Sequence, residues 1–266
     1  FEEDIEIEVS ENDLIDKAWI ADGRLYYTLK ENTGTERREA VITLKYNAGE
    51  ITATITIIQT EAGINSVYEI STPADLLAWN KDAKNWAADD YVVLLNDIDC
   101  TGAIDASKWN VNTNFTGTFD GNGKTIRNFV LEGTGSVAFI GSLKGDASVK
   151  DLTFDKTCSI KTSAAASKVA AAMLAATVTG NASIENIVNY GTVTADGKAA
   201  GSLNGSDLGG LVAEFNSTGH AQNCKNYGSV TFCVSEKPAK WTDVGGVFGK
   251  VSKQTDVDAG TIIGCE

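Results

Sequence analysis

The sequence predicts an all-β protein in which a small β-sandwich is followed by a parallel β-helix whose first edge is covered by a short helix. Apolar and polar residues alternate through residues 1–62, as they do in half-buried strands. From residue 137 onward the sequence repeats with a period of roughly 35 residues. The chain has 26 glycines but 2 prolines, a composition that suits short strands and tight turns.

Charge and composition exclude several classes of function. The 266 residues carry a formal net charge of −14, which argues against nucleic acid and against an anionic membrane surface as partners. No apolar run is long enough to span a bilayer. The five cysteines lack C-x-x-C spacing, so neither a zinc site nor a disulfide framework is predicted. The chain begins with Phe1, and we expect that a signal peptide has been removed.

Residues 1–62 are predicted to form the sandwich. Four runs place apolar side chains on one face of a strand. These runs are Ile5–Val9, Leu25–Leu29, Ile42–Tyr46 and Ile51–Ile57. Asn47-Ala48-Gly49 lies between the last two runs and predicts a hairpin turn. Several short strands with regular turns and no helix indicate a small sandwich.

Residues 31–60 resemble the bacterial immunoglobulin-like modules called BACON domains. The family shows an Asn, a turn, an Arg before a strand, and a closing strand that ends in Gln. Asn32, Arg37 or Arg38, and Gln59 occupy those places. The resemblance implies an Ig-like sandwich, and the short N-terminal strands imply a truncated copy.

A short helix is predicted after a linker at residues 60–66. Thr72 is a suitable N-cap, Pro73 suits the first helical position, and Asp75 completes a capping box. We expect a helix from Pro73 to about Ala83 that covers the first edge of the β-helix. The apolar residues that it would bury are Leu76, Leu77 and Trp79.

Residues 63–266 are predicted to form the β-helix, because two elements recur in them. The first element is aligned by an apolar residue at spacings of 34, 38 and 36 residues. Its four copies are marked by Phe139, Met173, Leu211 and Val247. The second element occupies 149–152, 184–187, 221–224 and 262–265. Stacking like strands about 4.8 Å apart would close one continuous core.

The aligned repeats also predict two side-chain ladders and resolve one conflict. Asn186 is expected to stack on Asn223, and Tyr190 on Tyr227 within a repeated Asn-Tyr-Gly motif. The Ala-rich run at 163–178 has high helix propensity. Its place in the register predicts strand instead, with Ala filling a narrow interior.

The start of this region resembles bacterial surface β-helix proteins with GLUG-type repeats. The family pairs an N-D-I-D strand with F-x-G-x-F-D-G-N-G-x-T-I, and both are present, at 96–99 and 115–126. Departures are an Ala-rich segment where the family has Gly-Gly, and an insertion at 233–243. The resemblance covers residues 66–266. It implies a right-handed β-helix at the cell surface of gut-type bacteria, in a secreted or lipoprotein adhesin.

Catalysis is not expected, although β-helical polysaccharide lyases and glycoside hydrolases remain the alternative class. A glycosidase needs two carboxylates on one face, and Asp97 and Asp99 have the spacing for it. Both, however, match the structural N-D-I-D strand of the family. Arg127 is the only arginine of the predicted β-helix, and His220, beside Gly219, is predicted to lie in a surface turn. The sequence therefore predicts a non-enzyme without a cofactor.

Metal and phosphate sites are not predicted. Gly121-Asn122-Gly123 lacks a following helix, so it predicts a β-turn with positive φ and not a phosphate loop. Asp120 and Asn122 offer oxygen ligands, but the chain has no D-x-D-x-D-G calcium loop. Cys224 and Cys265 align in neighbouring repeats and are expected to be free, buried thiols.

Three tryptophans in irregular segments are the candidate ligand-binding residues. Trp86, Trp109 and Trp241 fall outside the repeat register. Because flat aromatic rings present apolar faces on which sugars stack, these residues are predicted to bind an extracellular glycan or a host or cell-surface ligand. The alternative is that they fill gaps between loops and the core.

The C-terminal coil is predicted to associate with another copy of the protein. The sequence stops at Gly264-Cys265-Glu266, where earlier repeats continue with Asn-Tyr-Gly. A β-helix interrupted within a coil exposes backbone polar groups and an apolar cross-section. We therefore expect end-to-end self-association, or a longer natural chain.

Overall fold

The computed structural model describes residues 5–10, 14–21, 23–30, 38–46, 51–59, 66–105, 107–163, 168–197, 205–234, 242–252 and 261–266. The chain divides into two compact units, Phe1–Ile64 and Asn65–Glu266, against a predicted division after residue 62. Both are all-β, and the second also contains one short α-helix. Among the described residues, no helix has the length and apolar character needed to cross a membrane.

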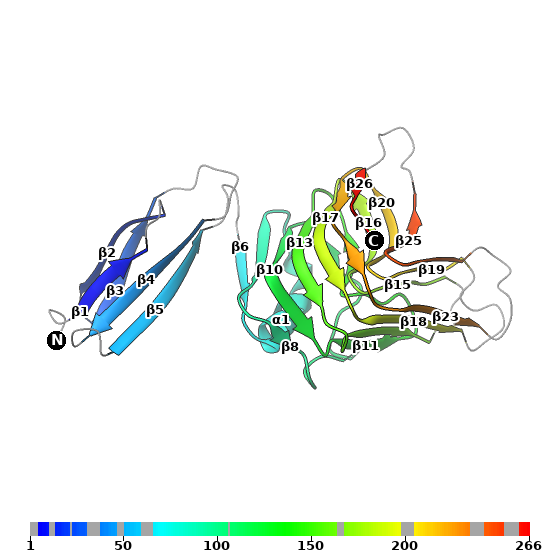
Figure 1. Cartoon of the computed structure of the whole chain (residues 1–266), viewed down its shortest axis with the longest axis horizontal. Coiled ribbons are helices and arrows are strands. Elements are labelled where there is room, and N and C mark those ends of the chain that lie inside the picture. The colour runs from blue at the N-terminus through cyan, green and yellow to red at the C-terminus, as the bar shows by residue number, and fades with distance from the viewer. Residues whose placement is uncertain are drawn as a thin grey trace. The chain divides into compact units, whose positions relative to one another are not determined.

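The first unit consists of two antiparallel sheets (Figure 1). One sheet has the order β1-β4-β5 and the other pairs β2 with β3. The strands are β1 (Ile5–Val9), β2 (Ile15–Ala21), β3 (Arg24–Leu29), β4 (Arg38–Tyr46) and β5 (Ile51–Gln59). The predicted hairpin turn at 47–49 lies outside the described residues, but the strands that flank it pair from Tyr46 and Ile51 onward.

The two sheets share one small core, as the sheets of a sandwich do. Its buried residues are Leu14, Ile15, Ala40, Ile42 and Ile57. The predicted apolar face of β5 is buried at Ile57, whereas Ile51 and Ile55 are exposed. Two residues that match the BACON pattern are in contact, because Arg38 Nη2 donates to Gln59 Oε1 at 2.5 Å. Asn32 and Arg37 lie outside the described residues.

The strands of the second unit pair in parallel and form four sheets. The largest sheet contains β6 (Ser66–Ile70), β7 (Asp90–Leu94), β8 (Ile98–Asp99), β10 (Thr118–Arg127), β13 (Ser148–Phe154), β17 (Ser183–Asn189), β21 (His220–Gln222), β22 (Lys225–Asn226) and β26 (Thr261–Ile263). In Figure 1 the arrows of β10, β13 and β17 lie side by side.

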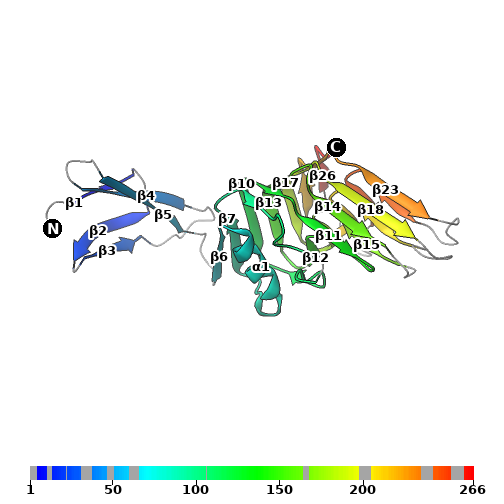
Figure 2. The same ribbon diagram turned by 90° about the horizontal axis from the view of Figure 1, so that it is seen from below.

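The other three sheets follow the same rule, in which each strand pairs with its counterpart in the next repeat. The second sheet contains β9 (Asn114–Phe115), β12 (Ile140–Leu143), β16 (Ala175–Gly180), β20 (Val212–Ser217) and β25 (Phe248–Val251). The third, seen in Figure 2, contains β11 (Val130–Gly133), β14 (Ser159–Thr162), β18 (Thr192–Gly197) and β23 (Val230–Val234). The fourth contains β15 (Ala170–Ala172), β19 (Asp207–Gly209) and β24 (Asp243–Gly245).

The register predicted from the second repeated element is confirmed. Val149 pairs with Ile184, Ile184 with Ala221, and Ala221 with Ile262. In the first element the pairing runs Ile140, Ala175, Val212, Phe248. The alignment of Phe139 with Met173 was therefore off by one residue for these strands. The Ala-rich run forms strands β15 and β16 as predicted, and residues 164–167 within it lie outside the described residues.

The predicted helix is present as α1 (Pro73–Lys81) and is followed by the 3-10 helix η1 (Ala83–Asn85). The capping box has formed, because Asp75 N donates to Thr72 Oγ1 at 3.2 Å and Thr72 N donates to Asp75 Oδ2 at 2.9 Å. Leu76 and Trp79 are buried and Leu77 is half-buried. The helix therefore adds its apolar residues to the core of the parallel sheets.

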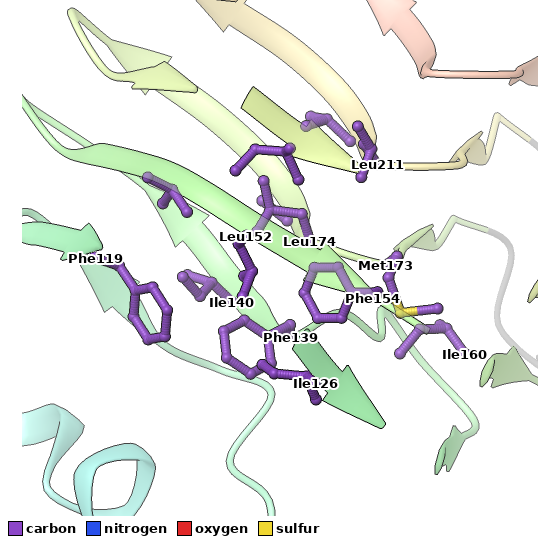
Figure 3. Packing of buried hydrophobic residues seen from close by; sticks show 14 of the residues in the cluster. Phe119, Ile126, Phe139, Ile140, Leu152, Phe154, Ile160, Met173, Leu174 and Leu211 are labelled. Carbon is purple, nitrogen blue, oxygen red and sulfur yellow. The ribbon is translucent and has the colours of Figure 1, made fainter. Parts of the chain in front are cut away.

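The core of the second unit is a single cluster that draws on all four sheets. Aromatic side chains fill the part nearest α1: Phe139 packs at an angle against Phe119 and Phe154, with ring centroids 5.6 and 5.5 Å away. Leu152 adds an aliphatic side chain beside these rings, and Leu174 and Leu211 continue the cluster into the later repeats (Figure 3).

A ladder of polar side chains runs along the largest sheet at a left-handed backbone position. Asp151, Asn186 and Asn223 have φ of 54°, 54° and 52°. Asn186 Nδ2 donates to Asp151 Oδ1 at 2.8 Å, and Asn223 Nδ2 donates to Asn186 Oδ1 at 3.1 Å. The predicted Asn186–Asn223 ladder is therefore confirmed, with Asp151 as a third member. Asn tolerates this conformation better than other residues with a Cβ.

The predicted β-turn at Gly121-Asn122-Gly123 is a bulge instead. Asn122 and Gly123 have positive φ, at 51° and 68°, as expected. They lie inside β10, where the pairing with β13 shifts between Asp120 and Lys124. Extra residues in one strand produce such a shift without reversing the chain.

The Asn ladder gives a first prediction. Asn186→Ala should lower the free energy of unfolding by about 1–2 kcal/mol. The substitution removes two side-chain hydrogen bonds, and alanine at positive φ has the steric strain of a Cβ atom without the local hydrogen bonds that an Asn side chain makes. Asn186→Gly loses the same hydrogen bonds but tolerates the backbone conformation. Urea unfolding should therefore rank wild type above Gly and Gly above Ala. An Ala variant as stable as wild type would show that the ladder contributes nothing.

Candidate functional site

Trp109, a predicted ligand-binding residue, belongs to the core. Its side chain is 3% exposed, and its Nε1 donates to Phe139 O at 3.1 Å. The indole stacks on the Phe139 ring at 5.3 Å and meets Phe129 edge to face. The expectation that Trp109 presents a face to a sugar is therefore wrong, because its indole N–H is hydrogen-bonded and its ring is packed inside the protein.

Trp86 is half-buried and also packs inward. Its ring stacks on Trp79 with centroids 4.5 Å apart, and its Nε1 donates to Trp79 O at 3.1 Å. Trp241 lies outside the described residues. Trp86 and Trp109 therefore fill gaps beside the core, as the alternative interpretation of these residues predicts.

Asp97 and Asp99 are held in structural hydrogen bonds. Asp97 Oδ1 accepts from Thr125 N at 2.9 Å, and its Oδ2 pairs with Arg127 Nη2 at 2.9 Å. Asp99 Oδ1 accepts from the Thr101 hydroxyl at 2.6 Å and from Asn128 Nδ2 at 2.8 Å. These bonds lower the pKa of Asp99 to about 2. Asp99 therefore stays ionised at neutral pH, which does not suit a general acid.

His220 lies in a strand, and the cysteines are not joined by disulfides. His220 begins strand β21 and does not lie in the predicted turn; its backbone N donates to Ser183 Oγ at 3.0 Å. Across the part of the chain that the structure describes, no three His, Cys, Asp or Glu side chains are grouped as metal ligands. All five cysteines are free thiols, and of the predicted buried pair Cys224 is buried and Cys265 half-buried.

Tyr190 and Tyr227 form the exposed aromatic feature that the tryptophans do not provide. Their side chains are 47% and 55% exposed. The two rings stack with centroids 5.2 Å apart and an interplanar angle of 22°, which confirms the predicted ladder. Among the described residues of the second unit, the other large exposed apolar side chains are aliphatic.

The residues that flank each tyrosine fix its backbone. Asn189 is buried, and its Nδ2 donates to Asn226 Oδ1 at 2.8 Å while its Oδ1 accepts from Gly191 N at 2.8 Å. Gly191 approaches the preceding repeat so closely that a Cβ there would lie 2.5 Å from Cys158 O. The Asn-Tyr-Gly motif thus places Asn inward, Tyr outward and Gly where the backbones are too close for a side chain.

The tyrosine pair continues a row of surface residues, one from each repeat. Arg127 pairs with Asp99, and Asp155 N donates to Ile126 O at 2.9 Å, which places Asp155 beside Arg127. Tyr190 N donates to Phe154 O, and Tyr227 N to Asn189 O, so the tyrosines follow in the same row. We call these residues the tyrosine row: Asp99, Arg127, Asp155, Tyr190 and Tyr227.

Charged groups lie at both ends of the tyrosine pair. Hydrogen bonds from Thr157, with a smaller contribution from Arg127, hold the pKa of Asp155 below its usual value. Beyond Tyr227, Lys225 Nζ pairs with Glu266 Oε1 at 2.5 Å, and the Tyr227 hydroxyl donates to the same oxygen at 3.4 Å. Ionised groups thus surround the aromatic surface.

This arrangement is suited to binding an extended polar ligand with apolar faces. Successive members of the row lie at, or directly after, the ends of adjacent strands, which are spaced about 4.8 Å apart. The phenol rings offer apolar surface and a polar hydroxyl, while Asp155 and Arg127 offer hydrogen-bond acceptors and donors. The repeated Asn-Tyr-Gly motif predicts the tyrosine ladder but not its exposure, and no motif in the sequence indicates that Asp155 lies beside Arg127.

A separate carboxylate, Asp207, is buried at the start of β19. It is 3% exposed and pairs in register with Ala170 and Asp243 on the adjacent strands. Burial raises its pKa to about 6, and the nearby Glu214 carboxylate adds to this effect. Glu214 itself pairs with Lys250 Nζ at 3.7 Å. Asp207 is therefore a group that changes charge near neutral pH.

Comparison with known proteins gives one partial similarity. Halomucin from Haloquadratum walsbyi (strain DSM 16790 / HBSQ001) is 29% identical over 170 residues. The alignment covers 58% of this chain but 2% of halomucin, so the chain corresponds to a small part of that protein. No family model matches the chain, and no solved structure matches it.

The raised pKa of Asp207 predicts a pH dependence of stability. The folded state holds this proton to about pH 6, whereas an unfolded Asp releases it near its ordinary value of about 3.9. The unfolded state thus binds fewer protons between these values, so this group lowers stability as pH rises through that window. Asp207→Asn removes the titration, so the free energy of unfolding of the variant relative to wild type should be higher at pH 8 than at pH 5.

Urea unfolding of both proteins at the two pH values tests this prediction. Asp243→Asn, on the neighbouring strand, removes a carboxylate that helps to raise the pKa of Asp207 and should therefore weaken the pH dependence without abolishing it. A difference between wild type and Asp207→Asn that is the same at pH 5 and pH 8 would show that Asp207 does not titrate in this range.

Proposed function

We propose that the second unit is a right-handed parallel β-helix with GLUG-like repeats that binds glycan without catalysis, through Tyr190 and Tyr227. The first unit is proposed to be a BACON-like Ig domain. The whole chain is proposed to belong to an adhesin-like protein that is secreted or attached to the outer membrane as a lipoprotein.

The pairing of like strands supports the β-helix. Four parallel sheets take one strand from successive repeats and contribute to one core. That arrangement is what stacked coils produce. The amphipathic helix α1 covers the first coil in this proposal, as the terminal cap of a repeat structure does.

The exposed tyrosine stack is the observation that carries the binding function. Burial of apolar surface is favourable, and two aromatic rings exposed side by side do not gain that free energy. Contiguous exposed apolar surface is a feature of interaction sites. The ionised groups beside it provide the polar contacts that a sugar also needs.

A surface location has two lines of support. The chain carries a net charge of −14, which suits a solvent-exposed protein that avoids anionic membranes. The partial likeness to halomucin supports placement at a cell surface.

Tyrosine substitutions test the binding function. A glycan array with the purified protein first identifies a ligand, and calorimetry then measures its affinity. Tyr190→Ala and Tyr227→Ala should each weaken binding by about 1 kcal/mol, because each removes one stacking surface. Tyr27→Ala, which removes an exposed tyrosine of the first unit, is the matched control and should bind as wild type does.

Two results would contradict this assignment. A double variant, Tyr190→Ala with Tyr227→Ala, that remains folded and binds with wild-type affinity would place the site elsewhere. An equal loss of affinity in Tyr27→Ala would show that the first unit takes part in binding.

A non-catalytic role predicts that polysaccharides are bound but not cleaved. Release of reducing sugar, or of unsaturated product, from acidic and neutral polysaccharides should stay at background. Asp97 and Asp99 make structural hydrogen bonds, so their Asn variants should affect stability and not turnover. Sustained cleavage that either substitution abolishes would favour the glycoside hydrolase or lyase alternative.

A further inference from the structure

The register of the last strands brings Cys224 next to Cys265. Gln222 pairs with Ile263 on the adjacent parallel strand. Beyond this pair, Asn223 N donates to Ile263 O at 2.9 Å and Glu266 N donates to Cys224 O at 3.0 Å. These bonds continue the register and place the two cysteines directly opposite each other.

Both thiols point to the same side of the sheet, toward the core. Cys224 is a buried member of the core cluster, and Cys265 packs against that cluster. Cys224 Sγ lies 3.4 Å from Gln222 O, and Cys265 Sγ lies 3.6 Å from Ala221 O, so both sulfurs face the same stretch of backbone. Burial raises the pKa of the Cys224 thiol, and the Cys265 thiol adds to this effect.

We propose that Cys224 and Cys265 are a site of reversible disulfide formation that links the last repeat to the one before it. Opposed residues on adjacent parallel strands have Cα atoms about 4.8 Å apart, within the usual range of about 4.4–6.8 Å for disulfides. The inference rests on this register. The oxidising environment that would keep the bond formed rests on the proposed surface location.

The reaction needs an oxidant, and a small disulfide such as oxidised glutathione is sufficient. Cys265 is half-buried and reachable, so its thiolate attacks the oxidant, forms a mixed disulfide and releases one thiol. Cys224 then loses its proton, attacks the Cys265 sulfur and displaces the second thiol. Two protein thiols and one small disulfide thus yield one protein disulfide and two small thiols.

The other buried cysteines provide an internal comparison. Cys100 N donates to Arg127 O, and Ser159, next to Cys158, donates to Phe129 O. The end of β10 and the two residues before β11 therefore lie between Cys100 and Cys158. These two thiols are equally buried but are not opposed, and they should stay reduced.

The proposal is tested by treating the Cys233→Ser variant with oxidised glutathione, since Cys233 is exposed and would otherwise link molecules. Peptide mapping should find Cys224 joined to Cys265, with Cys100 and Cys158 free. The midpoint of thermal unfolding should rise by about 5–10 °C and return on reduction. Adding Cys265→Ser, or alternatively Cys224→Ser, should abolish the rise.

Two outcomes would overturn the proposal. One is a lasting mixed disulfide on Cys265 with Cys224 still free, because that thiol would then be out of reach. The other is full retention of both thiols in glutathione buffers oxidising enough to form ordinary structural disulfides. No glycan is present in the experiment, so either outcome leaves the proposed binding function to be decided by the tyrosine variants.

Discussion

In-register hydrogen bonding between like strands of successive repeats is the interaction on which the second unit depends. Strand β13 bonds to β10 on one side and to β17 on the other, and no repeat satisfies its backbone alone. Opposed residues of a parallel sheet point to the same side, so one register decides both interior and surface. It places Val149 on Ile184 in the core and Tyr190 on Tyr227 outside.

The sequence was sufficient to predict whatever the repeats or local chemistry determine. Alignment of like segments gave the pairing of Ile184 with Ala221, and overrode the helix propensity of the Ala-rich run that forms β16. The Thr72 and Asp75 side chains were predicted to cap α1 because a capping box is a local interaction. Asn at a recurring position predicted the ladder that Asn186 and Asn223 form.

What could not be predicted lies where the register is interrupted or several repeats meet. Trp109 belongs to no repeat, so its distance from the core could not be judged, and it proved to pack on Phe139. The bulge at Asn122 keeps the predicted left-handed φ but serves to shift a register. Asp155 belongs to the candidate site because backbone pairing places it beside Arg127 and Tyr190, a relation that spacing within one segment does not show.

The row of one residue per repeat has an evolutionary consequence. Duplication of a gene segment that encodes one whole repeat would insert a further strand into each sheet and a further residue between Asp155 and Tyr190, or between Tyr190 and Tyr227. Existing neighbours would move apart by one further strand spacing, about 4.8 Å, and the hydrogen-bonding pattern would be kept. The length of the outer surface, and with it the length of polymer that the proposed site would contact, would thus change in whole steps without redesign of the interior.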